Sequence, residues 1–300
     1  MSNPDEPQIT GADVTPGATT LAPSVQPGGQ LGVTPPPNVV DFRGVTKRFG
    51  SITVIRDVTF TVEDVPNKGE FIAILGPSGC GKSTVLRLIA GLPPHYPASE
   101  GSVLVGGKPV IRPGSDRSMV FQDYTSFDNR TVEDNVAFGL ECRGVPARER
   151  RERAREWIAK VGLNVARDAT KFPSELSGGM RQRVAIARTL ILSPRIILMD
   201  EPFGALDPTT RLNMQELLVD LWREAQATVF FVTHSIEEAL FLGDRIYVFS
   251  GAPGTIIHQM FVPPATMPAK EMLREPSFVD RLCEIRDIMD AHSTPARPGA

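Results

Sequence analysis

The sequence predicts an α/β fold with a mostly parallel core sheet, a small antiparallel β unit and a helical subdomain. Apolar, strand-like runs recur at residues 71–75, 196–199, 228–233 and 246–249, and a helical pattern lies at 208–225 between two of them. Strands that alternate with helices form parallel sheets through right-handed crossovers. The run at 71–75 is apolar throughout, as expected of a strand that is buried on both faces.

Length and composition set the scale of the fold. The 300 residues suffice for one large domain or two small ones, and 41% hydrophobic with 22% charged residues is typical of a chain that buries a core. The net charge of −3 argues against a nucleic-acid surface as the main role. No apolar run approaches the roughly 20 residues that span a bilayer, which predicts a chain that is soluble or held on a membrane by a partner. The three cysteines lack metal-ligand spacing, which predicts reduced thiols.

Residues 1–38 differ from the rest of the chain. They contain eight prolines and five glycines but no Lys or Arg. Because secretory signals begin with basic residues and transit peptides are rich in arginine, neither is expected here, and the composition predicts a disordered tail. We expect a folded domain over residues 39–260 and a C-terminal extension over 261–300, with a weak helix near 278–290.

The first part of the folded domain combines short strands with one helix. Residues 58–62 alternate between apolar and polar side chains, which predicts a strand. Residues 85–90 have a helical pattern that ends at Gly91, a typical helix C-cap. Short runs at 102–105 and 109–110 predict edge strands of a small antiparallel unit.

The middle of the chain, about residues 124–190, predicts the helical subdomain. Within it, residues 146–161 mix Arg and Glu around a few apolar side chains such as Trp157 and Ile158. The preferred interpretation is the solvated face of a helix, and a partner-binding patch is the alternative.

A glycine-rich loop follows the apolar run at 71–75 and opens a helix. Glycines let the backbone wrap closely around phosphate oxygens, and successive N–H groups then point at the anion. The lysine supplies charge to the β- and γ-phosphates, and the hydroxyl after it is a ligand for Mg²⁺. The phosphate-binding loop consists of Gly76, Pro77, Ser78, Gly79, Cys80, Gly81, Lys82, Ser83 and Thr84.

Two carboxylates follow the apolar run at 196–199. Ligands of open parallel sheets bind beyond the carboxyl ends of the strands, so Asp200 and Glu201 should lie beside the phosphate-binding loop. Asp200 is positioned to hold Mg²⁺, as in other P-loop nucleotidases. Glu201 can orient or deprotonate the water that attacks the γ-phosphate.

Two further polar side chains follow predicted strands. His234 comes directly after the run at 228–233, and Gln122 follows the short apolar segment at 119–121. A lone histidine is more often structural, but a position at this sheet edge favours contact with the γ-phosphate. Gln122 offers its amide oxygen to a metal or to a water.

The segment Leu-Ser-Gly-Gly-Met-Arg-Gln at 176–182 predicts a second anion site. Ser177 can cap a helix, and Gly178 and Gly179 leave backbone N–H groups uncovered at its positive end. Helix N-termini of this kind bind anions. A chain that already has one phosphate-binding loop requires a reason for a second such site.

Together these motifs resemble the ATP-binding subunit of ABC transporters, a P-loop NTPase family. The resemblance covers about residues 39–260 and six motifs that stand in the family's order. They are the phosphate-binding loop at 76–84, the Q-loop glutamine Gln122, the signature at 176–179, the Walker B pair Asp200 and Glu201, the D-loop at 204–207 with Asp207, and the switch histidine His234.

The resemblance implies a mechanism and explains the second anion site. In the family two domains pair head to tail, so that the signature of one caps the γ-phosphate of ATP held by the other, and the two anion sites belong to two nucleotides. Lys82, Gln122, Glu201 and His234 would be catalytic, with ATP as the nucleotide. Ser83, Gln122 and Asp200 would hold Mg²⁺, and an aromatic residue at the position of Phe49 usually stacks on the adenine.

The resemblance also implies partners. We expect a homodimer or paired ATPase subunits, docked peripherally on integral membrane permease subunits at the cytoplasmic face of the cell membrane. The stretches at 200–207, 234–239 and 249–254 resemble the nitrate, sulfonate and taurine importers, which also use a periplasmic or extracellular substrate-binding protein. The alternatives are the ATPase of an ABC exporter and an ABC ATPase that acts outside transport.

Overall fold

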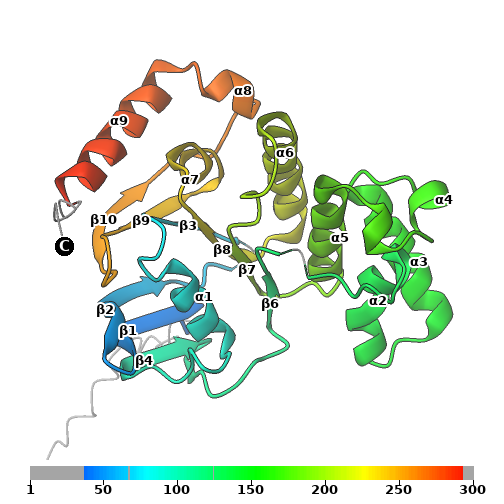
Figure 1. The fold of residues 1–300 in the computed structure, drawn as a ribbon, viewed down its shortest axis with the longest axis horizontal. Helices are drawn as coiled ribbons and strands as arrows, with labels where there is room; N and C mark the ends of the chain where they lie inside the picture. Colours follow the sequence, from blue (N-terminus) through cyan, green and yellow to red (C-terminus); the bar gives the residue numbers. More distant parts are fainter. Residues whose placement is uncertain (1–36, 67, 124, 293–300) are drawn as a thin grey trace, which may run out of the picture. The chain divides into compact units, whose positions relative to one another are not determined.

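The computed structural model describes residues 37–66, 68–123 and 125–292. The predicted tail therefore lies outside the described residues, apart from its last two. These described residues belong to one compact unit. It contains two β-sheets, with helices packed against the larger one and a separate group of helices at one side (Figure 1).

The larger sheet has six strands in the order β10-β9-β3-β8-β7-β6, which confirms the predicted mostly parallel core. Neighbouring strands from β9 to β6 are parallel, and only β10 runs antiparallel to β9. Every residue of β3, β7 and β8 is buried. The strand bounds are β3 Phe71–Leu75, β6 Arg117–Val120, β7 Ile196–Asp200, β8 Thr228–Thr233, β9 Arg245–Phe249 and β10 Ile256–Phe261.

The smaller sheet is antiparallel, in the order β2-β1-β4-β5, as predicted for the small β unit. Its two longest strands, β1 and β2, pair with Val40 opposite Val62, and β1 also pairs with β4. The bounds are β1 Val40–Phe49, β2 Ile52–Val62, β4 Glu100–Val105 and β5 Lys108–Pro109.

The helices fall into three groups. The first group is α1 alone, Lys82–Ala90, which follows β3. Its apolar side chains share one buried cluster with side chains from both sheets. The helical subdomain comprises α2 Val132–Cys142, α3 Ala147–Lys160, α4 Val165–Asp168, the 3₁₀ turn η1 Pro173–Glu175 and α5 Gly178–Leu190. The remaining helices are α6 Pro208–Ala225, α7 Ile236–Leu242, α8 Ala269–Met272 and α9 Pro276–Ala291.

The charged segment at 146–161 forms α3 as a solvated helix. Only Ala154 and Ile158 of this helix are buried, and they join the same hydrophobic cluster as α2 and α5. Arg155 pairs with Glu133 of α2 at 3.4 Å. Most of the Arg and Glu side chains of α3 are exposed, and some form pairs one turn apart, such as Arg148 with Glu152 at 3.0 Å. Exposed pairs of this kind add little stability, so α3 is held mainly by its two buried apolar side chains.

The C-terminal helices share a core with the larger sheet. Phe278 and Ile285 of α9 belong to one buried cluster with Ala73 and Leu75 of β3. The predicted C-terminal extension thus contributes apolar side chains that cover one face of the sheet. No helix in the described part of the chain is long and apolar enough to cross a membrane.

Candidate active site

The phosphate-binding loop joins the end of β3 to the start of α1. Gly79 and Gly81 have φ values of 78° and 100°, in the left-handed region that only glycine adopts without strain. Gly81 is the N-cap of α1, and no side chain caps this helix end. The uncapped N–H groups and the helix dipole at this end favour a bound anion.

Lys82, the first residue of α1, is buried within the loop. Its Nζ donates hydrogen bonds to the carbonyl oxygens of Gly76 and Pro77, both at 2.9 Å. The same ammonium lies 3.9 Å from Oε1 of Glu201. These contacts fix the positive charge at the centre of the loop, next to the end of β7.

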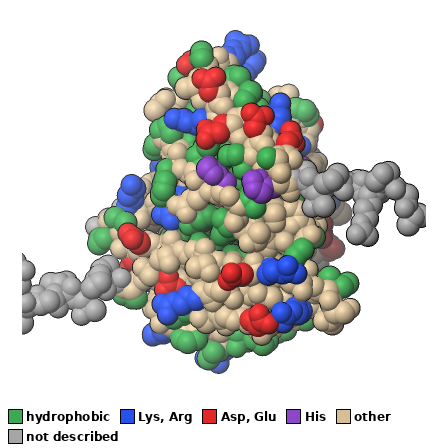
Figure 2. Space-filling view, turned by 90° about the vertical axis from the view of Figure 1, so that its left-hand side faces the viewer, with side chains coloured by type: hydrophobic (Ala, Val, Ile, Leu, Met, Phe, Trp, Pro, Cys, Tyr) green, Lys and Arg blue, Asp and Glu red, His purple; other side chains and the backbone are tan. Residues whose placement is uncertain are grey.

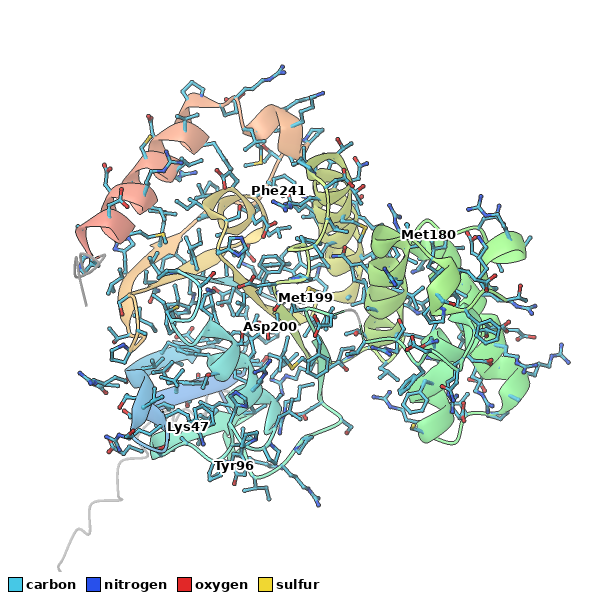
Figure 3. The ribbon with its side chains drawn as sticks, viewed as in Figure 1. Lys47, Tyr96, Met180, Met199, Asp200 and Phe241 are labelled. Atoms are coloured by element: carbon cyan, nitrogen blue, oxygen red, sulfur yellow. The ribbon has the colours of Figure 1, made fainter. Side chains whose placement is uncertain are left out.

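Ser83 and Asp200 meet across the site. The Ser83 hydroxyl donates a 2.6 Å hydrogen bond to Oδ1 of Asp200, and Arg87 of α1 lies 3.6 Å from Oδ2 of the same carboxylate. Burial raises the pKa of Asp200, and the Ser83 hydrogen bond and the Arg87 charge oppose that shift. Figure 3 shows Asp200 at the end of β7, between the two sheets.

The carboxylate and the imidazole at the sheet edge contact each other directly. Nδ1 of His234 lies 3.1 Å from Oε2 of Glu201. Glu201 itself has φ +44°, a left-handed conformation that is unusual for a residue other than glycine. Its N–H donates to the carbonyl oxygen of Val232 at 3.1 Å, so the residue is tied to β8 on its backbone side.

The structure therefore brings together five of the residues predicted from the sequence. They lie at or after the ends of the three neighbouring strands β3, β7 and β8, at one edge of the larger sheet. The contacts above link their side chains in pairs. The five are Lys82, Ser83, Asp200, Glu201 and His234.

No hydrogen bond or ion pair between described residues joins Gln122 to this group. It is exposed in the turn after β6 and lines a cavity of about 500 Å³ together with Arg181 and Ala205. Ala205 belongs to the segment that precedes α6, and Asp207 is the N-cap of that helix. Hydrogen bonds from Thr210 and Thr209 hold the pKa of the Asp207 carboxyl below its usual value.

The second predicted anion site is the N-terminus of α5. The exposed Ser177 caps this helix, and its Oγ accepts a 3.3 Å hydrogen bond from the Met180 N–H. A side chain added at Gly178 would meet open space. Among the described residues, no hydrogen bond or ion pair joins Ser177 to the phosphate-binding loop, and Figure 3 places Met180 well apart from Asp200.

Phe49 ends β1 as a half-buried ring. It meets the His95 ring edge-on at a centroid distance of 5.1 Å, and Nζ of Lys47 lies 5.0 Å from its centre. A partly exposed ring at this position has a surface on which an adenine can stack.

A family model described as "ABC transporter" matches residues 55–204, half of the chain. That stretch begins in β2, includes the phosphate-binding loop and the α5 N-terminus, and ends just after Glu201. The chain belongs to the ABC transporter family.

Similar proteins and a solved structure agree with this assignment. The taurine import ATP-binding protein of Rhizobium johnstonii is 49% identical over 236 residues, 77% of this chain and 87% of that protein. The nitrate import ATP-binding protein of Synechocystis is 42% identical over 254 residues, 82% and 91% of the two chains. A solved ATP-binding cassette, a dimeric post-hydrolysis state bound to ADP and Pi, matches with a TM-score of 0.64 at 33% identity, over 75% of this chain and 99% of that one.

The ABC transporter motifs do not include every residue that shapes the site. Arg87 faces Asp200, yet an arginine on an amphipathic helix looks like an ordinary surface residue in the sequence. Gly254 lies against the phosphate-binding loop, because a side chain added there would overlap the carbonyl oxygen of Cys80. Its own N–H donates to the Val54 carbonyl and its carbonyl accepts from the Arg56 N–H, both at 2.9 Å, which ties it to β2. The turn signal at 251–254 marks a loop but does not show what the loop contacts.

Replacing Gly254 by Ala should weaken ATP binding. A methyl group there would overlap the carbonyl oxygen of Cys80, and the two backbone hydrogen bonds keep Gly254 from moving away. The phosphate-binding loop must then shift, and overpacking of this kind costs about 1–3 kcal/mol, which corresponds to an ATP dissociation constant raised by roughly 5- to 150-fold. Calorimetric titration with ATP measures the change.

Gly251→Ala is the matched control for this substitution. Gly251 lies in the same loop, but a side chain added there meets nothing within 4 Å. Its ATP affinity should equal that of the parent chain. Equal affinities in both variants would show that the loop at 251–254 does not position the phosphate-binding loop.

Proposed function

We propose that this chain is the ATP-hydrolysing subunit of an ABC importer, which powers uptake of a small solute through separate membrane permease subunits. The observation that carries the proposal is the Glu201 carboxylate, which lies 3.1 Å from His234 and 3.9 Å from Lys82 at one end of the sheet. A general base, a positive charge and a polar contact for the γ-phosphate are thereby gathered at one point.

Each residue has a role in this mechanism. The loop at 76–84 surrounds the phosphates of ATP with backbone N–H groups, and Lys82 neutralises charge on the β- and γ-phosphates. Glu201 orients the attacking water and accepts its proton. His234, in contact with Glu201, donates a hydrogen bond toward the γ-phosphate, while the Phe49 ring stacks on the adenine.

The oxygen atoms of Ser83 and Asp200 fit a magnesium ion. They lie 2.6 Å apart, and hydroxyl and carboxylate oxygens are the ligands that Mg²⁺ prefers. When bound, Mg²⁺ would neutralise phosphate charge and fix the phosphate orientation. Phosphate oxygens, water and Gln122 would complete the coordination.

The separation of the two anion sites supports a head-to-tail dimer. Ser177, Gly178 and Gly179 of one chain would cap the γ-phosphate of ATP held by the loop at 76–84 of a second copy or a paired subunit. Asp207 and the 204–207 segment then lie at the interface between the two chains. The solved cassette to which this chain is similar is dimeric and bound to ADP and Pi, which supports a dimer as the working unit.

A groove beside β6 is the proposed docking site for the permease subunits. It encloses about 550 Å³ between β6, α2 and α5, and its lining combines Phe121, Phe127 and Phe138 with Arg143 and Arg188. Phe127 is 38% exposed although its ring packs at a tilted angle against Phe138, with the ring centroids 4.4 Å apart. An open apolar groove with cationic edges fits a short amphipathic helix of the permease. We place the chain peripherally at the cytoplasmic face of the membrane.

Nitrate, a sulfonate and taurine are the candidate solutes. The relatives named above are taurine and nitrate import proteins, and each of these solutes carries a small oxyanion group. The solute would reach the permease from a periplasmic or extracellular substrate-binding protein. Figure 2 shows acidic and basic side chains interspersed on the face that it draws.

Thiol alkylation in the presence of the permease tests the proposal. Cys142 lines the proposed docking groove and is exposed, whereas the exposed Cys283 lies on α9 and serves as an internal control. The permease subunits are prepared in detergent or nanodiscs. They should slow maleimide labelling of Cys142 by about tenfold or more and leave the labelling rate of Cys283 unchanged. The ATPase activity of the same chain is measured in parallel. Equal labelling rates with and without the permease would contradict docking in this groove.

A further inference from the structure

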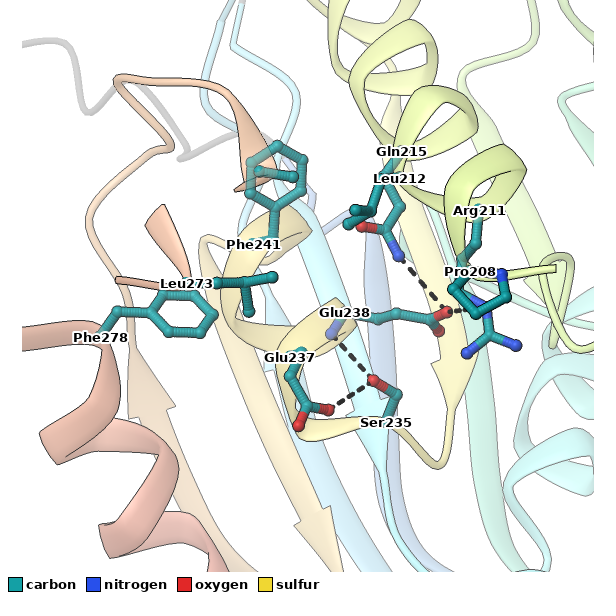
Figure 4. Close-up of a pocket in the computed structure, with 11 residues that line it drawn as sticks. Pro208, Arg211, Leu212, Gln215, Ser235, Glu237, Glu238, Phe241, Leu273 and Phe278 are labelled. Atoms are coloured by element: carbon teal, nitrogen blue, oxygen red, sulfur yellow. Dashed lines mark hydrogen bonds and ion pairs between the residues drawn. The ribbon is translucent and has the colours of Figure 1, made fainter. Parts of the chain in front are cut away.

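Glu238 is a buried carboxylate that bonds to two separate segments near the site. It lies in α7 with 6% of its surface exposed. The hydroxyl of Thr233, the last residue of β8, donates to Glu238 Oε2 at 2.5 Å, and Nε2 of Gln215 in α6 donates to Oε1 at 3.4 Å. Figure 4 shows Glu238 reaching from α7 toward α6.

On the Thr233 side of this network, the bonded residues are the two neighbours of His234 in the chain. Thr233 Oγ1 also accepts a 3.0 Å hydrogen bond from the Ser235 N–H, and the Glu238 N–H donates to Ser235 Oγ at 3.2 Å. His234 lies between the two bonded residues, and its own side chain is 54% exposed. The position of the imidazole therefore depends on how its two neighbours in the chain are held.

The α6 side of the network leads to the 204–207 segment. Nε of Arg211 lies 3.8 Å from Glu238 Oε1, and Nη2 of Arg211 donates to the Leu206 carbonyl oxygen at 3.2 Å. Nε is buried and has no hydrogen-bond partner, so the Glu238 carboxylate supplies the compensating charge nearby. Burial raises the pKa of Glu238, and the Thr233 hydrogen bond and the Arg211 charge oppose that shift.

Apolar packing is incomplete where α6 and α7 face each other. A cavity of about 230 Å³ lies there, lined by Leu212, Phe241, Leu273 and Phe278 as well as by Glu238 (Figure 4). Close packing normally fixes the relative position of two helices. Because the packing is incomplete here, the polar contacts of Glu238 contribute more to holding α7 in place against α6.

We propose that Glu238 is a positioning residue for ATP hydrolysis, whose carboxylate holds the His234 segment and the 204–207 segment in one relative position. This inference rests on the proposed function, because one segment carries the histidine that faces the γ-phosphate and the other lies at the interface of the two chains. Glu238 does not touch the nucleotide. It acts through Thr233 on one side and through Arg211 on the other.

Glu238→Gln tests the proposal in the full chain. The glutamine keeps the size of the side chain and can still accept from Thr233, but its amide N–H₂ group faces the donors of Gln215 and Arg211. The turnover number should fall about 10- to 100-fold, as expected when catalytic groups are misplaced by about 1 Å. The ATP dissociation constant of the monomer and the melting temperature should stay close to those of the parent chain.

Glu237→Gln is the matched control, because Glu237 is the preceding residue, is exposed, and bonds only to the Ser235 hydroxyl among the contacts of the described residues. Its turnover number should stay within about twofold of the parent value. A second variant, Thr233→Val, removes the hydroxyl that links Glu238 to the His234 segment while keeping the side-chain volume. It should show the same split between turnover and ATP affinity, and it provides the test if Glu238→Gln does not fold.

The outcomes separate this inference from the function on which it rests. A parent chain that does not hydrolyse ATP would overturn both. An active parent with unchanged turnover in Glu238→Gln, or in Thr233→Val, would overturn the positioning role alone. The positioning role is also overturned if turnover falls only in proportion to lost ATP affinity or lost folded protein, since that pattern indicates a purely structural residue.

Discussion

Replacing Glu201 by Gln is expected to lower the turnover number for ATP about 10²- to 10⁴-fold, while ATP binding survives. The glutamine keeps the side-chain shape but cannot accept the proton of the attacking water, and general-base catalysis typically contributes a factor of this size. Nucleotide binding depends on the loop at 76–84 and on Lys82, which the substitution leaves in place. Because the step after dimer formation is blocked, ATP-bound dimers should accumulate.

Two measurements on the same preparation check this expectation. Phosphate release gives the turnover number, and size-exclusion chromatography with light scattering gives the dimer fraction with and without ATP. Glu156→Gln, an exposed glutamate on α3, is the control for loss of one negative charge and should behave like the parent chain. Near-normal turnover in Glu201→Gln would exclude Glu201 as the general base.

The second large effect is expected at the N-terminus of α5. Ser177→Arg and Gly179→Asp should each abolish most ATP hydrolysis and leave the ATP affinity of the monomer unchanged. Ser177 is exposed, so an arginine fits there but would cover the N–H groups meant for the γ-phosphate of the partner chain. An aspartate at 179 places a negative charge where a phosphate is to bind, after a small shift of the Thr210 side chain.

Two other causes of lost hydrolysis must be distinguished from the proposed one: a variant that is less stably folded, and a signature that contacts the nucleotide of its own chain. Ser177→Arg also removes a helix cap, which costs about 0.5–2 kcal/mol of stability, so Ser177→Ala serves as the control that loses the cap without adding bulk. Thermal unfolding of both variants should agree within a few degrees. A reduced ATP affinity of the Ser177→Arg monomer would mean that the signature acts on the nucleotide of its own chain.

Where the sequence pattern is strong and local, it predicted the fold closely. The structure confirms the strand at 71–75, the helix at 208–225 and the strand at 228–233 with the same bounds. The two runs are short and rich in β-branched and aromatic residues, which favours strands over helices, and Pro208 with Asp207 before it marks the helix start.

Elements whose burial depends on distant partners escaped prediction. Strand β1, Val40–Phe49, buries Asp41, whose carboxylate accepts hydrogen bonds from Asn38, Arg43 and Thr61, and its register shifts after Phe42. Strand β10 is a half-exposed edge strand that shows no continuous apolar run. In both cases the sheet neighbours, and not the local pattern, determine the strand.

The same distinction applies to the candidate site. The phosphate-binding loop and the Asp200–Glu201 pair follow from contiguous residues, because their chemistry is local. Glu238 and Arg211 stand 27 positions apart in the sequence, and no spacing rule connects them. Such pairs arise only when α7 and α6 have been placed by the rest of the fold, so their contact cannot be read from one sequence.

The left-handed backbone of Glu201 has a consequence for attempts to make this protein more heat-resistant. Holding a residue with a side chain at φ +44° costs about 1–2 kcal/mol of stability. A glycine there would relieve this strain, whereas its greater freedom in the unfolded chain lowers stability by only about 0.4–1 kcal/mol. Thermal robustness and turnover are therefore opposed at this one position. A variant library screened only for survival at high temperature should enrich chains that have lost the carboxylate, so any such screen needs activity as a second criterion.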